Sequence, residues 1–172
     1  RRLGDVYKRQ PEGIGNLTRL RELRLYNNRL TSLPDSLGNL TDLLELHLMD
    51  NRLASLPDSL GNLMRLKELR LSGNHLTSLP GSLGRLTNLA HLDVRNNRLM
   101  DLPESMGSLA RLTHLDLRAN RLVALPAWIG HLPNLEKLDL RWNKLSSLPA
   151  EILRLERRGC IVPVSYTHLT LP

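Results

Sequence analysis

A 23-residue period is the feature of this sequence that most restricts its fold. The pair Leu-Pro recurs at that step through most of the chain, and an asparagine keeps the same step five residues earlier. The pairs begin at Leu33, Leu56, Leu79, Leu102, Leu125 and Leu148, and the asparagines are Asn28, Asn51, Asn74, Asn97, Asn120 and Asn143. Repeats of equal length bury the same positions against their neighbours, so they stack into a solenoid. The composition agrees: Phe is absent and aromatic residues make up only 3%, so the core must repeat one leucine-lined shape.

Six full repeats span residues 17–154 and share the pattern LxxLxxLxLxxNxLxxLPxxLGx, with an occasional Val, Ile or Met in place of leucine. They cover residues 17–39, 40–62, 63–85, 86–108, 109–131 and 132–154. A partial repeat precedes them at residues 11–16, and residues 155–162 resemble a degenerate last strand that would cap the solenoid. We therefore assign residues 11–162 to one domain.

The Leu-x-Leu element of each repeat alternates between two faces, which predicts a short strand. Strands of consecutive repeats can only pair in parallel, about 4.8 Å apart. The proline of each Leu-Pro pair sets φ for a short helical or 3-10 turn, and we expect the following glycine, Gly38 in the first repeat, to leave that turn in the left-handed conformation. The predicted fold is an α/β repeat: a curved solenoid with a parallel β-sheet on its concave side and these bulkier turns on its convex side.

This pattern resembles the leucine-rich repeat family over residues 11–162. In that family the recurring asparagines form a hydrogen-bonded ladder between repeats. The 23-residue form is similar to the intracellular class that includes Ras-binding scaffolds and plant Ras-group proteins, and the cysteine-rich caps of extracellular members are missing. The resemblance implies a cytoplasmic signalling scaffold, with a small GTPase or another signalling protein as partner.

The two ends of the chain match complementary strands of one DNA element. Residues 5–10 can be encoded GAT GTG TAT AAG AGA CAG, and the reverse complement of that string, read one frame over, encodes residues 164–168. The string resembles the transposon mosaic end used in sequencing-library preparation, so we interpret residues 1–10 and 163–172 as adapter artefacts. They account for +3 of the net charge of +7 and leave +4, which weakens any argument from a basic composition.

Side chains beside the strand leucines are expected to point to solvent on the concave face and to form columns across the repeats. Early repeats place glutamates beside arginine or histidine, and late repeats place aspartates between histidine and arginine. One interpretation is a lattice of mutually neutralising ion pairs; the other is a recognition strip with aromatic and methionine anchors. The candidate protein-binding residues are Arg24, Tyr26, His47, Met49, Arg70, His91, Asp93, Arg95, His114, Asp116, Arg118, Asp139, Arg141 and Trp142.

Other chemistries have little support in the sequence. The single Cys160 excludes a disulfide framework and has no histidine or acid placed to act with it, although Arg157 and Arg158 could lower its pKa. His91 and His114 share a column and could share a metal with an aspartate, but nothing encloses such a site. The basic residue after each ladder asparagine lacks aromatic neighbours for base stacking, which argues against nucleic acid. We expect no catalytic residue, metal, cofactor, small-molecule substrate or membrane insertion.

The predicted function is a non-catalytic protein–protein interaction module, a signalling scaffold or adaptor that holds its partner on the concave face. The alternative is the recognition arm of a larger enzyme such as a kinase, a GTPase or a ubiquitin-ligase effector. A third interpretation is a structural or adhesive array without a discrete site. The residues that would separate these alternatives lie outside the repeats.

Overall fold

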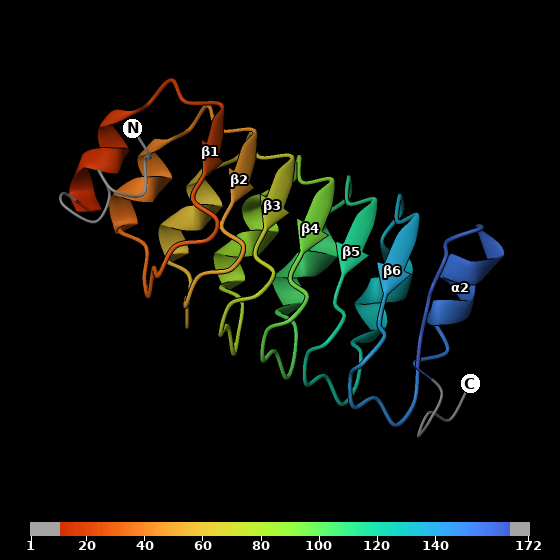
Figure 1. Ribbon diagram of the computed structural model, residues 1–172. Helices are drawn as coiled ribbons and strands as arrows, with labels where there is room; N and C mark the ends of the chain where they lie inside the picture. The colour runs from red at the N-terminus through yellow and green to blue at the C-terminus, as the bar shows by residue number, and fades with distance from the viewer. Residues whose placement is uncertain (1–10, 166–172) are drawn as a thin grey trace.

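The computed structural model describes residues 11–165, which form one row of stacked repeats (Figure 1). Each full repeat contributes one three-residue strand, followed by a short helical element. The strands are β1 (Glu22–Arg24), β2 (Glu45–His47), β3 (Glu68–Arg70), β4 (His91–Asp93), β5 (His114–Asp116) and β6 (Lys137–Asp139). The 3-10 helices are η1 (Pro11–Asn16), η2 (Asp35–Asn39), η3 (Asp58–Asn62), η4 (Gly81–Arg85), η5 (Glu104–Ser108) and η6 (Ala127–His131), and the α-helix α2 (Ile152–Arg157) ends the last repeat.

The six strands form one parallel sheet in chain order. Neighbouring strands pair with an offset of one repeat, so that Leu23 lies opposite Leu46 and Leu46 opposite Leu69. A shift of one residue would turn the leucines of a strand toward solvent, so burial alone selects this register. The predicted parallel sheet is confirmed.

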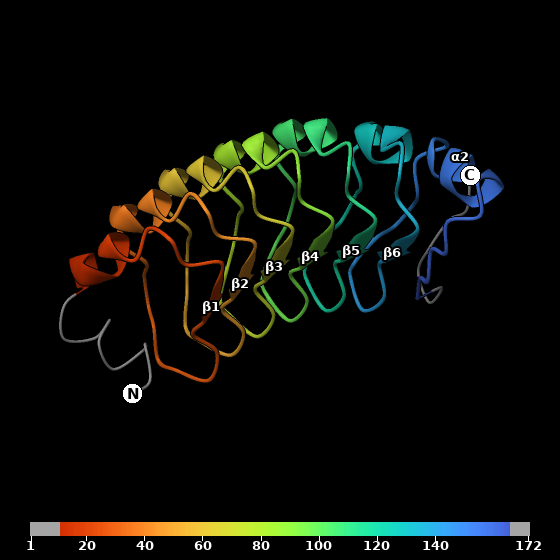
Figure 2. The same cartoon turned by 90° about the horizontal axis from the view of Figure 1, so that it is seen from above.

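The 3-10 helices line the convex side of the row and the strands its concave side (Figure 2). Pro34 precedes η2 with φ at −72°, and the Leu37 N–H donates to the Pro34 carbonyl at 3.1 Å. Proline suits this position because its fixed φ is close to the helical value. It lacks an N–H, but an N–H at the start of a helix has no acceptor within the helix, so no hydrogen bond is lost. The helical turns are wider than the strands, so the row bends. The predicted curved solenoid with 3-10 turns on its convex side is confirmed.

The glycine near the end of each 3-10 helix, Gly38 in η2, has a different role from the one we predicted. Among the described glycines, only Gly73 and Gly159 have positive φ, so Gly38 does not leave its turn in the left-handed conformation. Gly38 instead permits close contact between neighbouring 3-10 helices, because a Cβ there would lie 2.7 Å from the Ser59 carbonyl oxygen. The expectation was wrong because the constraint comes from the adjacent repeat and not from the turn itself.

Left-handed backbone occurs instead two residues after the second apolar residue of each Leu-x-Leu element, such as Leu25 in the first repeat, where the chain turns away from the sheet. Asparagine, aspartate and glycine tolerate this conformation, whereas it is sterically unfavourable for alanine and tryptophan. Ala119 has φ at 52° and Trp142 has φ at 59°, so both are strained. The six residues with positive φ at this position are Asn27, Asp50, Gly73, Asn96, Ala119 and Trp142.

Reciprocal substitutions at this position test the strain. Ala119→Gly should stabilise the protein by about 0.5–1 kcal/mol, because removing the Cβ relieves the left-handed penalty by more than the added freedom of glycine costs. Gly73→Ala should destabilise it, because the new Cβ would be strained at φ 69° and would lie 2.3 Å from Asp50 Oδ1. Urea denaturation midpoints measure both effects. A midpoint for Ala119→Gly below that of the wild type would contradict the assignment.

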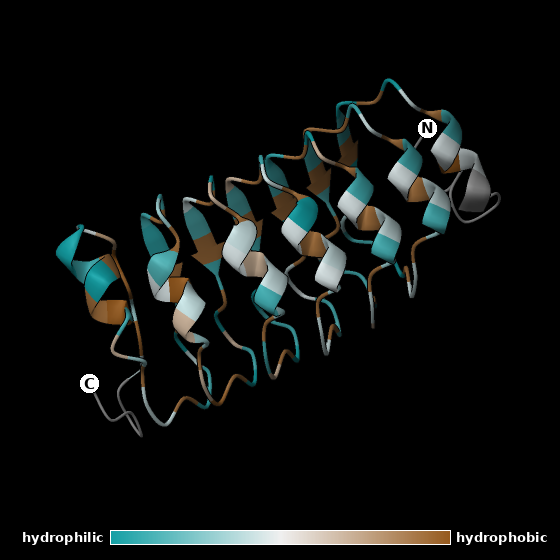
Figure 3. Ribbon diagram, turned by 180° about the vertical axis from the view of Figure 1, so that it is seen from behind, coloured by the Kyte–Doolittle hydropathy of each residue, from teal (hydrophilic) through white to brown (hydrophobic). Residues whose placement is uncertain are grey.

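The repeat leucines form one continuous core along the solenoid. Leu23, Leu46 and Leu69 are fully buried, and the same holds for most of their equivalents in the other repeats. Figure 3 shows hydrophobic colour in the strands and in the 3-10 helices, with hydrophilic colour beside it. The core is less well shielded from solvent at the first repeat, where Leu17 is 39% exposed. No helix in residues 11–165 is long and apolar enough to cross a membrane.

The C-terminal end of the row is covered by α2 and by the chain that follows it. The Leu138 N–H donates to the Ile161 carbonyl and the Leu140 N–H to the Pro163 carbonyl, both at 2.9 Å, which adds an irregular parallel segment beside β6. Backbone pairing does not depend on side-chain identity, so the adapter interpretation of residues 163–172 stays a prediction. Residues 1–10 and 166–172, which it also concerns, lie outside the described residues.

The recurring asparagines connect each repeat to the one before it. Asn97 is 7% exposed. Its Nδ2 donates to the carbonyls of Val94 and Arg95 in its own repeat and of Leu71 in the preceding repeat, at 2.9–3.2 Å. Its Oδ1 accepts the Leu76 N–H at 3.0 Å. The same four bonds recur at Asn51, Asn74, Asn120 and Asn143.

The first member of this ladder provides a matched control for its energetic weight. Asn28 is half-buried and donates only within its own repeat, to the carbonyls of Leu25 and Tyr26. Asn97→Ala should cost about 3 kcal/mol, because it leaves several buried backbone groups without a partner, whereas Asn28→Ala should cost about 1 kcal/mol. Urea unfolding of both variants checks this. Equal losses would show that the bonds between repeats contribute nothing beyond the local turn.

Candidate functional site

The sheet arranges the candidate binding residues in three columns across the concave face. The first column is Glu22, Glu45, Glu68, His91, His114 and Lys137, and the centre column is Arg24, His47, Arg70, Asp93, Asp116 and Asp139. The third column, two residues further along each repeat, is Tyr26, Met49, Ser72, Arg95, Arg118 and Arg141. The structure thus places all the predicted binding residues in these columns, except Trp142, which lies next to Arg141.

In the first three repeats the centre column pairs backward with the first column. Arg24 forms an ion pair with Glu22. Nε2 of His47 lies 3.1 Å from Glu45 Oε2. The third pair joins Arg70 Nε to Glu68 Oε2 at 3.3 Å. Since each of these contacts joins the two columns, the early half of the concave face is occupied by two arginine–glutamate ion pairs and one histidine–glutamate contact.

In the last three repeats the centre column pairs forward with the third column. Nε of Arg95 lies 3.4 Å from Asp93 Oδ2, and Nη2 of Arg141 lies 2.7 Å from Asp139 Oδ2. Arg118 contacts two carboxylates: its Nε donates to Asp116 at 2.9 Å and lies 3.4 Å from Asp139. The aspartates are therefore neutralised away from the first column.

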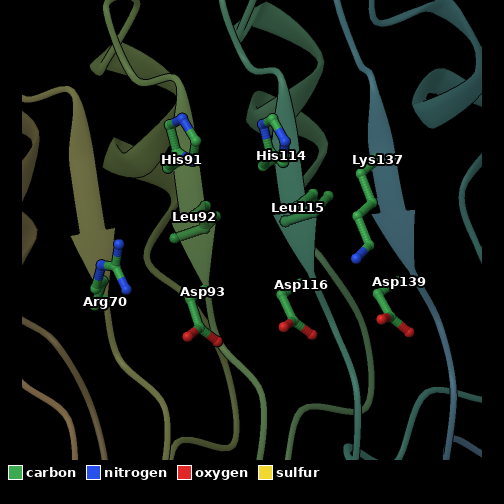
Figure 4. A pocket seen from close by; sticks show the side chains of 9 residues that line it. All are labelled: Arg70, His91, Leu92, Asp93, His114, Leu115, Asp116, Lys137 and Asp139. Carbon is green, nitrogen blue, oxygen red and sulfur yellow. The ribbon is translucent and has the colours of Figure 1, made fainter. Parts of the chain in front are cut away.

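This change of direction coincides with a hollow of about 170 Å³ over β3 to β6 (Figure 4). On one side the rings of His91 and His114 stack in parallel, with centroids 4.5 Å apart and an interplanar angle of 6°. Asp93 and Asp116 lie on the opposite side in Figure 4. Lys137, which was not among the predicted binding residues, also lines the hollow. In the sequence, Lys137 follows His91 and His114 at the 23-residue step, and this position could have identified it as a binding residue.

Two aspartates in the centre column have opposite electrostatic situations. Burial raises the pKa of Asp93, and the hydrogen bond from the Arg95 N–H and the charge of Arg95 offset this only in part. Burial acts in the same direction on the pKa of Asp139, but the hydrogen bonds from Arg141 and the charges of Arg141 and Arg118 outweigh it and hold that pKa below its usual range. The side chain of Asp139 is 2% exposed and enclosed by two guanidinium groups.

These directions predict opposite effects of neutralising the two side chains. A depressed pKa means that ionised Asp139 stabilises the fold at neutral pH, and that this contribution is lost as the pH falls through the folded-state pKa. Asp139→Asn should therefore lower the urea midpoint at pH 7, with a smaller difference from wild type in acid. The raised pKa of Asp93 reverses the sign, so Asp93→Asn should leave the midpoint at pH 7 unchanged or higher. A larger loss for Asp93→Asn than for Asp139→Asn would contradict this.

The proposed anchors do not form one cluster. Tyr26 is 43% exposed next to β1, and Trp142 is 62% exposed next to β6, five repeats away. The Arg141 guanidinium lies 5.3 Å from the centre of the Trp142 ring, a distance at which cation and ring attract each other. Met49 is half-buried. Tyr26 and Met49 are neighbours in the third column at one end of the face, and Trp142 lies at the other end.

The residues that could hold a metal differ from those singled out in the sequence, and the thiol of Cys160 differs from the expectation in the direction of its pKa shift. Within residues 11–165, the group whose ligand atoms lie within 4.8 Å of one another is Glu22, Glu45 and His47. Glu22 already forms an ion pair with Arg24, and His47 already contacts Glu45. His91 stacks on its neighbour and does not belong to such a group. Burial raises the pKa of the Cys160 thiol, with Arg158 offsetting it only in part, so the expected lowering by arginine does not prevail.

Comparison with known families matches most of the chain. A family model described as "Leucine rich repeat" matches residues 42–99, 64–122, 87–145 and 110–156, and one described as "Leucine Rich repeats (2 copies)" matches residues 18–62. These matches cover more than half of the chain. The search of curated protein sequences finds no match.

Solved structures of similar shape come from several sources. A leucine-rich repeat protein of Leptospira interrogans has a TM-score of 0.86 and 36% identity over 94% of this chain and 40% of its own. The leucine-rich repeat domain of the type III effector XopL has a TM-score of 0.74 and 32% identity over 90% of this chain and 64% of its own. The ectodomain of the plant membrane receptor kinase GASSHO1/SCHENGEN3 from Arabidopsis thaliana, in complex with CASPARIAN STRIP INTEGRITY FACTOR 2, has a TM-score of 0.71 and 30% identity over 94% of this chain and 23% of its own. This chain spans less than two thirds of each.

Proposed function

This chain belongs to the leucine-rich repeat family, and on that basis we propose that its concave face binds a protein partner and catalyses no reaction. Domains of this family generally mediate protein–protein interactions. The observation that carries the proposal is the hollow over β3 to β6. A partner that enters it meets His91, His114 and Lys137, which form no ion pair within residues 11–165.

The unpaired side of the hollow favours binding for an electrostatic reason. A group that contacts an already neutralised carboxylate must first displace its guanidinium, which offsets much of the gain. A group that contacts Lys137, His91 or His114 breaks no ion pair within residues 11–165, and His114 can keep its contact of 2.9 Å between Nδ1 and Thr113 Oγ1. The rigid sheet adds to this, because its backbone is held by the asparagine ladder and loses little freedom on binding.

In more detail, the proposed role is that of a scaffold or adaptor in signalling. The protein would belong to the 23-residue intracellular class and be located in the cytoplasm. The regular 23-residue period supports the class. A small GTPase is one candidate partner within it. The ectodomain in complex with CASPARIAN STRIP INTEGRITY FACTOR 2 supports the more general idea that such a solenoid holds another molecule.

A second candidate function is the recognition arm of a larger enzyme. One comparison favours it: the similar Arabidopsis ectodomain belongs to a membrane receptor kinase, and this chain spans 23% of that ectodomain. In this case the concave face would still bind a partner, and the reaction would be carried out by another domain.

A triple substitution in the hollow tests the proposed function. His91→Ala, His114→Ala and Lys137→Ala together remove the unpaired side of the hollow without breaking an ion pair. If the hollow is a binding centre, capture of partner proteins on immobilised chain should fall about tenfold or more, as expected when central contacts are lost. Quantitative mass spectrometry of the captured proteins measures this.

The matched control changes three exposed side chains on the convex face. Asp35→Ala, Asp58→Ala and Glu104→Ala alter the first residues of η2, η3 and η5, which are exposed and form no ion pair within residues 11–165. This variant should capture the same proteins as the wild type, and the urea midpoints of both variants show whether the fold is kept. Equal capture by the two folded variants would refute the concave site.

A further inference from the structure

A row of unpaired positive charge runs along the edge of the sheet, beyond the carboxyl ends of the strands. The residue after each ladder asparagine is exposed, and five of the six are permanently charged. We call this row the rim ladder; it consists of Arg29, Arg52, His75, Arg98, Arg121 and Lys144. Within residues 11–165 none of its members forms an ion pair.

The backbone holds the rim ladder in register. The Arg98 N–H donates to the Leu76 carbonyl of the preceding repeat at 2.8 Å, and the Arg121 N–H to the Leu99 carbonyl at the same distance. Equivalent bonds begin at Arg52, His75 and Lys144. Successive members are therefore one hydrogen-bonded chain apart, which is about 5 Å. Side chains of like charge attached at that backbone spacing repel one another, which favours an anionic partner.

The nearby carboxylates do not neutralise this row. In the last three repeats the three aspartates of the centre column pair with Arg95, Arg118 and Arg141 of the third column. Asp50 and Asp101 are close to the ladder in sequence, and neither is in an ion pair within the described residues. The five permanent positive charges of the ladder outnumber these two carboxylates, so the net charge along this edge is positive, and Arg98, Arg121 and Lys144 belong to the repeats that line the hollow.

We propose that the rim ladder binds an acidic segment of the protein partner, with carboxylates recurring at about one per helical turn. This rests on the proposed function, since it names the chemistry of the partner. The helical pitch of about 5.4 Å matches the spacing of the ladder. Nucleic acid fits less well, because the ladder has no aromatic member, and the neighbouring Tyr26 and Trp142 lie at opposite ends.

A synthetic alanine-based helix of about 20 residues with one glutamate per turn serves as the probe. Arg98→Glu, Arg121→Glu and Lys144→Glu together should weaken its binding about tenfold or more in fluorescence anisotropy at low salt. The matched control, Arg19→Glu, Arg85→Glu and Arg157→Glu, makes the same change in net charge at exposed residues outside the ladder that form no ion pair in the described part of the chain. It should bind like the wild type apart from a small loss from net charge. Binding by the wild type should weaken as salt is raised.

Three outcomes would overturn the proposal: no binding of the acidic helix to the wild type, equal loss in the two triple variants, or tighter ladder-dependent binding of oligothymidylate or phosphatidylserine vesicles. Circular dichroism shows that each variant is folded.

The proposed function is tested separately by capture with the His91, His114 and Lys137 variant. If that capture depends on the hollow while the acidic helix fails, only the partner chemistry is refuted. If capture is indifferent to the hollow while the helix binds, the concave site is refuted and the acidic ligand remains.

Discussion

The buried asparagine amide at the end of each strand is the interaction on which the rest of this structure depends. Leucine packing supplies most of the burial, but one leucine accommodates another at many small offsets. The amide of Asn97 is more selective, because three carbonyls and one N–H from two repeats converge on it and would be left unsatisfied by a shift. The ladder therefore determines both how one repeat meets the next and where the chain leaves the sheet.

The convex face depends on a second close contact. Gly15, Gly38, Gly61 and Gly84 bring neighbouring 3-10 helices to distances at which a Cβ would collide with the adjacent serine. The last 3-10 step departs from this rule, since Trp128 takes the serine position and lies 3.5 Å from the site of a Cβ on Gly107. Figure 2 shows a wider space between η5 and η6 than between the earlier helices. Trp128 also leaves its buried Nε1 without a hydrogen-bond partner in the described structure.

Strict register has an electrostatic consequence on the concave face. Equivalent residues of adjacent repeats stand one strand apart, so a column of like charges is destabilising unless a neighbouring column neutralises it. The protein meets this requirement in two ways, with Arg70 pairing backward to Glu68 and Asp93 pairing forward to Arg95. The boundary between the two patterns lies between β3 and β4, beside the hollow. The hollow in the concave face therefore results from the direction in which the surrounding charged side chains form their ion pairs.

The repeat, the parallel sheet, its register and the membership of each column are determined by the sequence alone. They follow from units of equal length whose leucines must be buried, and this requirement leaves one arrangement. The tertiary structure decided that Asp93 pairs with Arg95, that Gly38 serves a contact between repeats, and that Ala119 and Trp142 are left-handed. The physical reason is that these features depend on distances between side chains of neighbouring repeats and on local backbone angles. A period specifies which residues are neighbours, but not the direction in which their side chains turn.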